Sequence, residues 1–258
     1  MWRKFRIAVL LFILATVAHR AWLQEQHLQW KDPINVALFP LKADDGNAEV
    51  SAYIVNLDKV QFQLIADFLA EEAKRHGLAL DRPFELRLAP SMNQLPPKPP
   101  QKGGLMQAVM WSMHFRWWSW RHSPETAVPA DMQLYLLYHD PKQHKVLPHS
   151  TALNKGRLGL INVFADHKYE NQNAVVIAHE LLHAVGATDK YDPSTNQPAY
   201  PQGFAEPGKQ PVYPQDFAEL MAGRIPLAKD RAEMPADLSK TMIGDMTAAE
   251  IGWLRNKL

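Results

Sequence analysis

The chain has 258 residues, of which 47% are hydrophobic, and this is enough apolar material for one sizeable core. Its formal net charge of +1 argues against nucleic acid as a primary partner. The absence of cysteine excludes disulfides, thiolate metal ligands and a cysteine nucleophile.

The first 23 residues predict an export signal or a membrane anchor. Residues 7–18 form an uninterrupted apolar run behind three basic residues, and this order is typical of such segments. Cleavage after Ala18 would release the protein, whereas a stretch continuing through Trp22 would leave it anchored in the inner membrane. In both cases we expect the body, after a linker at 24–33, to lie on the periplasmic or extracellular side of a bacterial envelope.

The segments between residues 34 and 164 predict an α/β domain. Apolar runs rich in strand formers occur at 34–41, 84–89, 132–139 and 158–164. A helix is expected at 58–76, where apolar residues recur at helical spacing: Val60, Leu64, Phe68, Leu69 and Ala73. Strand–helix–strand order favours a twisted, mostly parallel sheet. The run at 158–164 is expected either as an edge strand that receives an extended peptide or as an internal core strand.

Two unusual segments interrupt this order. Proline and glycine at 90–104 predict an extended linker or exposed loop. The helix-compatible stretch just beyond contains four tryptophans, Trp111, Trp117, Trp118 and Trp120. Two interpretations are open: a binding ridge or membrane-facing patch, and an aromatic helix packed on the sheet, which is favoured.

The most specific functional motif in the chain is the segment 179–189, HELLHAVGATD. His179 and His183 stand one helical turn apart, so both imidazoles can bind one metal ion. Glu180 is placed to accept a proton from a metal-bound water as the water attacks a carbonyl carbon. The competing interpretation is a chance match, in which the two histidines are a polar stripe on a core helix.

The flanks of this motif support a metal site. The polar run at 170–173 is expected to cap the start of the helix. Gly186 can take the left-handed conformation that ends the helix, and the turned chain would then direct Asp189 back to the metal. Three protein ligands and one water are the arrangement of catalytic zinc.

The pattern HExxHxxGxx, followed by a third ligand, resembles the zinc motif of the metzincin metallopeptidases. The resemblance implies that Zn²⁺ is the cofactor, that His179, His183 and Asp189 are its ligands, and that Glu180 is the catalytic base. Most metzincins have histidine as the third ligand, whereas Asp189 looks like the aspartate variant of the snapalysin-type secreted bacterial peptidases.

Three other acids remain open as the third ligand. Asp192 is the nearest in sequence, and Glu206 or Glu219 would fit a different clan whose third ligand is a glutamate further downstream.

The resemblance also implies a methionine turn beneath the metal. The segment 218–223 is similar to it, with Met221 as the methionine, and a thioether there can form a soft apolar floor. Met234 and Met242 are weaker alternatives. Residues 245–254 look like the family's C-terminal helix, and Thr247 with Glu250 would make a capping box.

The implied architecture is a metzincin-like catalytic domain at 34–258, with an upper subdomain at about 34–186 and a small lower subdomain at about 187–258. Between the motif and the methionine turn, the proline-rich loop at 192–216 is expected to form a stiff wall of the cleft. Tyr191 or Tyr213 could donate a hydrogen bond to the oxyanion formed during hydrolysis.

The expected function is a zinc-dependent endopeptidase acting on extended protein or peptide substrates. Two alternatives stay open: a catalytically inactive, tethered binding or scaffold protein, and a zinc hydrolase of a non-peptide amide such as a cell-wall component. The intact Glu180 argues against the first, and only substrate assays separate the second.

Overall fold

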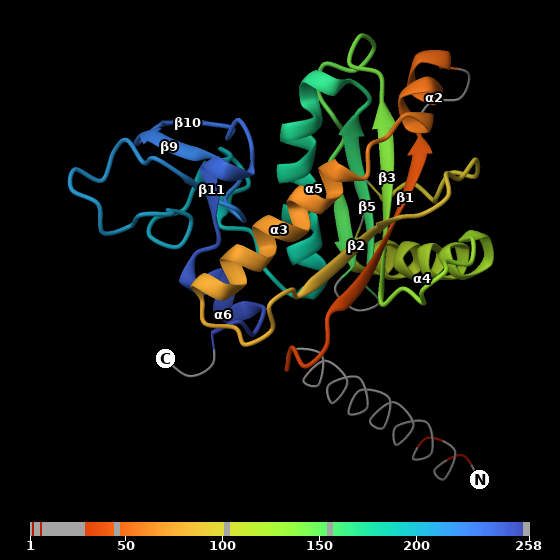
Figure 1. Ribbon diagram of the computed structural model, residues 1–258, viewed down its shortest axis with the longest axis horizontal. Helices are drawn as coiled ribbons and strands as arrows, with labels where there is room; N and C mark the ends of the chain where they lie inside the picture. Colours follow the sequence, from red (N-terminus) through yellow and green to blue (C-terminus); the bar gives the residue numbers. More distant parts are fainter. Residues whose placement is uncertain are drawn as a thin grey trace.

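A five-stranded mixed sheet is the centre of the computed structural model, which describes residues 29–43, 47–100, 104–153 and 157–254 and the single positions 2 and 6. The strand order is β2–β1–β3–β5–β4 (Figure 1). The first four run parallel and β4 is antiparallel to β5. The strands are β1 (Ile34–Lys42), β2 (Phe84–Leu88), β3 (Met132–His139), β4 (Thr151–Leu153) and β5 (Leu158–Phe164). The predicted α/β class with a mostly parallel sheet is confirmed.

Helices cover both faces of this sheet, as the continuous apolar character of its strands requires. On one face lie α2 (Ala48–Val55), α3 (Val60–Arg75) and α5 (Glu170–Val185), and on the other lies α4 (Leu105–His122). Neighbouring residues of β1 show the alternation: Val36 belongs to the core beneath α3 and α5, and Ala37 to the core beneath α4.

The expected apolar row of α3 was wrong in part. Leu69 and Ala73 are buried, but Val60 and Leu64 are exposed, and the buried row of the helix continues through Phe62, Ile65 and Ala66 instead. Both sets of residues recur at helical spacing, so the periodicity identifies a helix. Which side of that helix faces the core is decided by its contacts with α5 and β2.

The prediction that 158–164 is a free edge was also wrong. β4 pairs with β5 at Leu158, Gly159 and Leu160, so β4 is the edge strand on this side of the sheet. Further along β5, the backbone N–H of Asn162 donates to Ser150 Oγ at 3.0 Å. The remaining interpretation, an internal core strand, describes β5.

Two predicted helix caps are not formed. Tyr169 precedes α5 without a side-chain cap, and Asn173 instead bonds the backbone N and O of Phe164, at 3.0 and 2.8 Å. The C-terminal helix, α6 (Asp245–Glu250), begins after Gly244, so Thr247 lies inside it and cannot cap it. In both places the side chain that the local pattern assigned to a cap makes a tertiary hydrogen bond instead: Asn173 with Phe164, and Thr247 with Glu219.

After α5 the chain forms small two-stranded sheets beside that helix (Figure 1). Their strands are β6 (Tyr191–Asp192) with β7 (Gln197–Pro198), β8 (Ala218–Glu219) with β11 (Thr241–Met242), and β9 (Ile225–Ala228) with β10 (Arg231–Glu233). Short 3-10 helices occur at η1 (His167–Tyr169) and η2 (Leu238–Lys240). The indole of Trp30 donates to Ile251 O at 2.7 Å and joins the beginning of the domain to its end.

The predicted N-terminal segment at 7–18 lies outside the described residues. Of the helices that the structure does describe, none combines the length and apolar character needed to cross a bilayer. The proline- and glycine-rich segment at 90–104 contains no helix or named strand over its described part, but Met92 is buried and forms a bridge to Leu41.

Candidate metal centre

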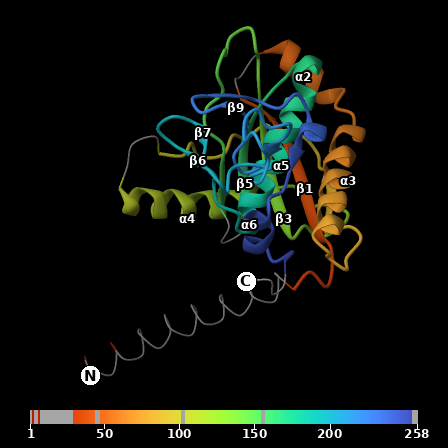
Figure 2. The same cartoon turned by 90° about the vertical axis from the view of Figure 1, so that its left-hand side faces the viewer.

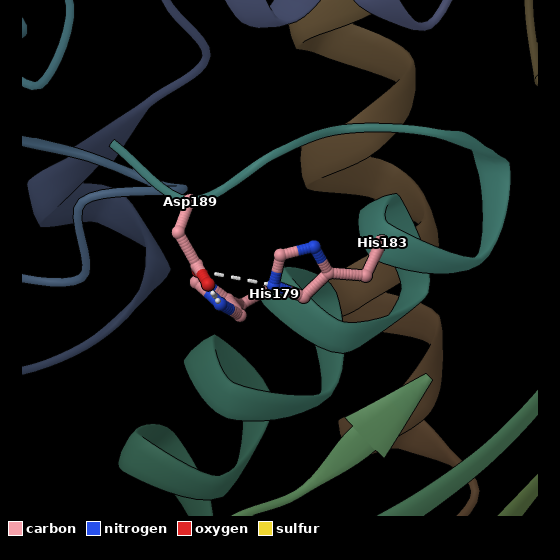
Figure 3. A group of neighbouring side chains, drawn as sticks. All are labelled: His179, His183 and Asp189. Atoms are coloured by element: carbon pink, nitrogen blue, oxygen red, sulfur yellow. Dashed lines mark hydrogen bonds and ion pairs between the residues drawn. The ribbon is translucent and has the colours of Figure 1, made fainter. Parts of the chain in front are cut away.

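The three predicted ligands converge at the end of α5 (Figure 3). His179 and His183 project from one side of the helix, and Gly186 ends it at φ +117° in the left-handed conformation. Asp189 Oδ1 then lies 3.3 Å from His179 Nε2 and 3.1 Å from His183 Nε2. In the described part of the chain, this is the group of histidine and acidic side chains whose ligand atoms lie close enough to hold a metal ion.

Both imidazoles are oriented by backbone carbonyls on the side away from Asp189. His179 Nδ1 lies 2.9 Å from Leu220 O, and His183 Nδ1 lies 2.8 Å from Ala187 O. A carbonyl only accepts, so each Nδ1 carries the proton and each Nε2 of the neutral ring keeps its lone pair. The outer hydrogen bond of a metal-binding histidine is usually of this kind.

Two imidazole nitrogens and a carboxylate oxygen that converge on one point can share a metal cation or, when an imidazole is protonated, a hydrogen bond. Zinc bonds of about 2.0–2.1 Å at tetrahedral angles place neighbouring ligand atoms about 3.3 Å apart. The two separations from Asp189 Oδ1, 3.1 and 3.3 Å, match this value. The residues present therefore fit a zinc ion with His179, His183 and Asp189 as ligands, and the side chain of Asp189, 43% exposed, leaves the site open to solvent.

The acid and one histidine stabilise each other's charge. Burial opposes the ionisation of Asp189, but hydrogen bonds from the two histidines in their protonated form outweigh it, and the pKa of Asp189 lies well below its usual range. Burial likewise opposes the charging of His183, yet the hydrogen bond with Asp189 leads the opposing causes and raises the pKa of His183. Asp189 is thus anionic at neutral pH, the charge state that a candidate oxygen ligand requires.

Glu180 is buried beside the three converging side chains. Its pKa is raised above the usual value by burial, against the attraction of His179 and His183. A carboxylate with a raised pKa is a better proton acceptor than an exposed one, and this suits the predicted base. His149, which the sequence analysis did not single out, also interacts electrostatically with Glu180. No motif surrounds His149 that could have indicated this.

The structure keeps the alternative third ligands away from the histidines. Asp192 accepts hydrogen bonds from the backbone and hydroxyl of Ser194. Glu206 Oε2 accepts from the backbone of Asp216 at 2.8 Å. Glu219 is fully buried in a network of its own.

The backbone on both sides of Asp189 is held by residues distant in sequence. Glu250 accepts from the backbone N–H and the hydroxyl of Thr188, at 2.9 and 2.7 Å. The buried ammonium of Lys190 donates to Glu250 at 2.7 Å, and its backbone N–H donates to Met221 O at 3.0 Å. The sequence contains no signal for the role of Lys190 and favoured a helix cap for Glu250, because only the folded chain brings α6 to this loop.

The segment 218–223 lies beside His179, since its Leu220 O is the acceptor for that imidazole. Met221 is fully buried within it, whereas Met234 is 42% exposed and is therefore unsuited to an apolar floor. Met242 is paired with Glu219 in the β11–β8 sheet, one strand further away. Met221 is therefore the buried methionine of this segment, and its role in a methionine turn stays a prediction.

Glu219 braces this turn from inside. Its carboxylate accepts from Ala222 N at 3.0 Å, Gly244 N at 3.1 Å and Thr247 Oγ1 at 2.7 Å. Burial raises the pKa of Glu219, and these three donors act against the rise. The network ties the turn to the start of α6.

Thr247→Val is expected to lower the free energy of unfolding by about 1.5–3 kcal/mol, because it removes a hydrogen bond to a buried carboxylate while preserving side-chain volume. Urea denaturation of the wild type and the variant measures the difference. A loss below about 0.5 kcal/mol, the usual range of surface substitutions, would contradict the bracing role.

The two candidate tyrosines have different surroundings. Burial, together with the nearby Asp189 that accepts its hydrogen bond, raises the pKa of Tyr191. Tyr213 instead packs its ring against Phe204, with centroids 5.6 Å apart. Tyr191, which precedes the proline-rich loop, therefore lies at the candidate centre, while Tyr213 belongs to an aromatic cluster within the loop.

Comparisons with known proteins assign no family. No protein-family model matches the chain, and no curated protein matches it. A solved structure named "Structure of a chaperone-substrate complex" is similar over 85% of this chain, with 15% sequence identity and a TM-score of 0.41. This chain spans 33% of the length of that one. Similarity at this level assigns neither an activity nor a partner.

Proposed function

We propose that this protein is a zinc-dependent endopeptidase of metzincin type. The observation that carries the proposal is the convergence of two imidazole nitrogens and one carboxylate oxygen at zinc-ligand spacing, with both Nδ1 atoms bonded to backbone carbonyls. A polar stripe on a core helix would need neither the oriented rings nor the acid. We further propose a location in the bacterial envelope, in agreement with the basic and apolar N-terminus.

Each residue of the site has a role in this reaction. His179, His183 and Asp189 would hold the zinc ion, which when bound supplies Lewis acidity toward the scissile carbonyl and lowers the pKa of a water. Glu180 takes the proton from that water and passes it to the leaving amine. The Tyr191 hydroxyl, which has one hydrogen to donate, leaves Asp189 and donates its hydrogen bond to the developing oxyanion.

The edge of the sheet is a feature in favour of extended peptide substrates. β4 is an edge strand, and it packs against α5, the helix that carries the site. An extended peptide that pairs with the outer edge of β4 would run alongside that helix, with its backbone hydrogen bonds supplying affinity for many sequences. This role replaces the one first expected of residues 158–164.

The deciding experiment is digestion of a mixed peptide library by the full-length, zinc-loaded protein in detergent, read by mass spectrometry with and without a zinc chelator. Cleavage that disappears with the chelator and returns with added zinc is expected. Bound zinc without any peptide cleavage would overturn the peptidase proposal in favour of a scaffold protein or a non-peptide amidase, and release of fragments from cell-wall material would identify the latter.

Tyr191→Phe is expected to lower kcat by about 100-fold, the effect of removing one oxyanion donor, with little change in KM. Tyr213→Phe is the matched control, because that ring lies in the aromatic cluster, and its kcat should stay near the wild-type value. A loss of zinc affinity in Tyr191→Phe, with normal kcat at saturating zinc, would instead limit Tyr191 to orienting Asp189.

A further inference from the structure

An exposed apolar row follows the outer side of α4. Its members are spaced alternately four and three residues apart, so they lie on one face of the helix. They are Met106, Met110, Met113, Trp117 and Trp120, with exposed fractions of 73, 61, 61, 54 and 79%. Trp111, Phe115 and Trp118 lie on the opposite side and pack toward the sheet. The helix is therefore the packed aromatic helix favoured from the sequence, with a second apolar face turned outward.

Among the described residues, none forms a core beneath the first part of α4. Every residue from Gly104 to Met110 is exposed, including Leu105 at 84% and Val109 at 43%. Figure 2 shows the helix extending sideways from the sheet. Five exposed methionine and tryptophan side chains in one row are uncommon on a soluble monomer. Such a row indicates a surface that is covered by a membrane or by another molecule.

The charges of α4 suit an anionic surface. The helix contains no acidic residue, and its basic residues are Arg116 and Arg121 together with His114 and His122. At 100° per residue, Arg116 and Arg121 lie on opposite sides of the apolar row. An apolar face containing tryptophan and bordered by arginine is the pattern of a helix that lies in the interfacial layer of an anionic bilayer.

The N-terminus would bring the same part of the molecule to a membrane. The segment that the sequence predicts as an anchor ends shortly before β1, whose second residue is Asn35. The backbone N–H of Asn35 donates to Asp131 Oδ2 at 2.9 Å, in the connection that leads from α4 to β3. The start of the domain therefore lies beside the segment that leaves α4, so an anchored chain has its α4 region close to the bilayer.

We propose that the row from Met106 to Trp120 lies in the interfacial layer of an anionic lipid bilayer, parallel to the membrane surface. The methionine and tryptophan side chains enter the region between headgroups and acyl chains, and Arg116 and Arg121 contact lipid phosphates. The domain is thereby held in one orientation by two contacts, the N-terminus and α4. This proposal is independent of the peptidase activity.

Because the chain has no cysteine, a single substitution gives a unique site for a spin label. The full-length Met113→Cys variant is labelled and reconstituted at low density into vesicles of phosphatidylcholine and phosphatidylglycerol. Val146→Cys is the matched control: Val146 is 82% exposed in the loop after β3, which lies away from α4 (Figure 1). Collisions of each label with a water-soluble nickel chelate and with lipid-dissolved oxygen are measured by electron paramagnetic resonance.

The Met113 label is expected to lose collisions with the chelate severalfold and to gain collisions with oxygen, while the Val146 label stays accessible to water. Equal accessibility of both labels to the chelate would overturn the proposal. So would a Met113 label shielded from both colliders, with dipolar coupling between labels, because that result assigns the row to a second copy of the chain. In vesicles of phosphatidylcholine alone, the protection should be weaker.

Discussion

Replacing Glu180 by Gln is expected to lower kcat/KM for peptide cleavage by about 100- to 10,000-fold, the contribution of a positioned general base. The amide keeps the size of the side chain but cannot accept a proton from water. Since Glu180 is not one of the converging ligands, the variant should still bind one zinc ion per chain. Steady-state kinetics on a peptide identified from the library, with zinc content by mass spectrometry, measures both quantities.

Glu71→Gln is the matched control, because it makes the same chemical change at an exposed position of α3. It should cleave at the wild-type rate. If Glu180→Gln retained more than about a tenth of the activity, a change below the range of general-base catalysis, the assignment of Glu180 as the base would be wrong.

Asp189→Asn is expected to weaken zinc binding by about 100-fold or more, since losing even an outer partner of a metal ligand costs 10- to 100-fold. The amide keeps the shape of the side chain but removes the negative charge that both histidines face at 3.1 and 3.3 Å. Competition with a fluorescent zinc chelator measures the affinity directly, without dependence on a substrate.

Asp192→Asn separates the two aspartates that the sequence left open. Its carboxylate bonds Ser194 in an exposed turn, so this substitution should leave zinc affinity unchanged. A loss of zinc in Asp192→Asn with normal binding in Asp189→Asn would reverse the assignment and would require the loop after Gly186 to rearrange when metal binds.

The strands could be predicted because burial on both faces leaves a strong local pattern. The runs at 132–139 and 158–164 have the same bounds as β3 and β5, whose residues are almost all buried. What could not be predicted was the lateral order of the strands. β4 is short and only half-buried, with no apolar run to indicate it, yet its pairing with β5 decides which strand is the edge.

The sequence by itself determined the candidate site as far as local geometry extends. Two histidines one helical turn apart, a glutamate between them and a helix-ending glycine define their relative positions through backbone geometry alone. It also determined the class of the fold, since apolar runs and helical periods are properties of neighbouring residues.

Only the tertiary structure decided what depends on distant partners. It brought Asp189, and not the three other acids, to the two histidines, placed Leu220 O behind His179, and assigned Glu250 to Thr188 and Lys190 instead of to a cap. It also turned one face of α4 toward the sheet and left the other exposed. Each of these features is a contact between segments far apart in the chain. The residues next to such a contact in sequence do not indicate which distant residue it will be made with, so the contact cannot be read from a local pattern.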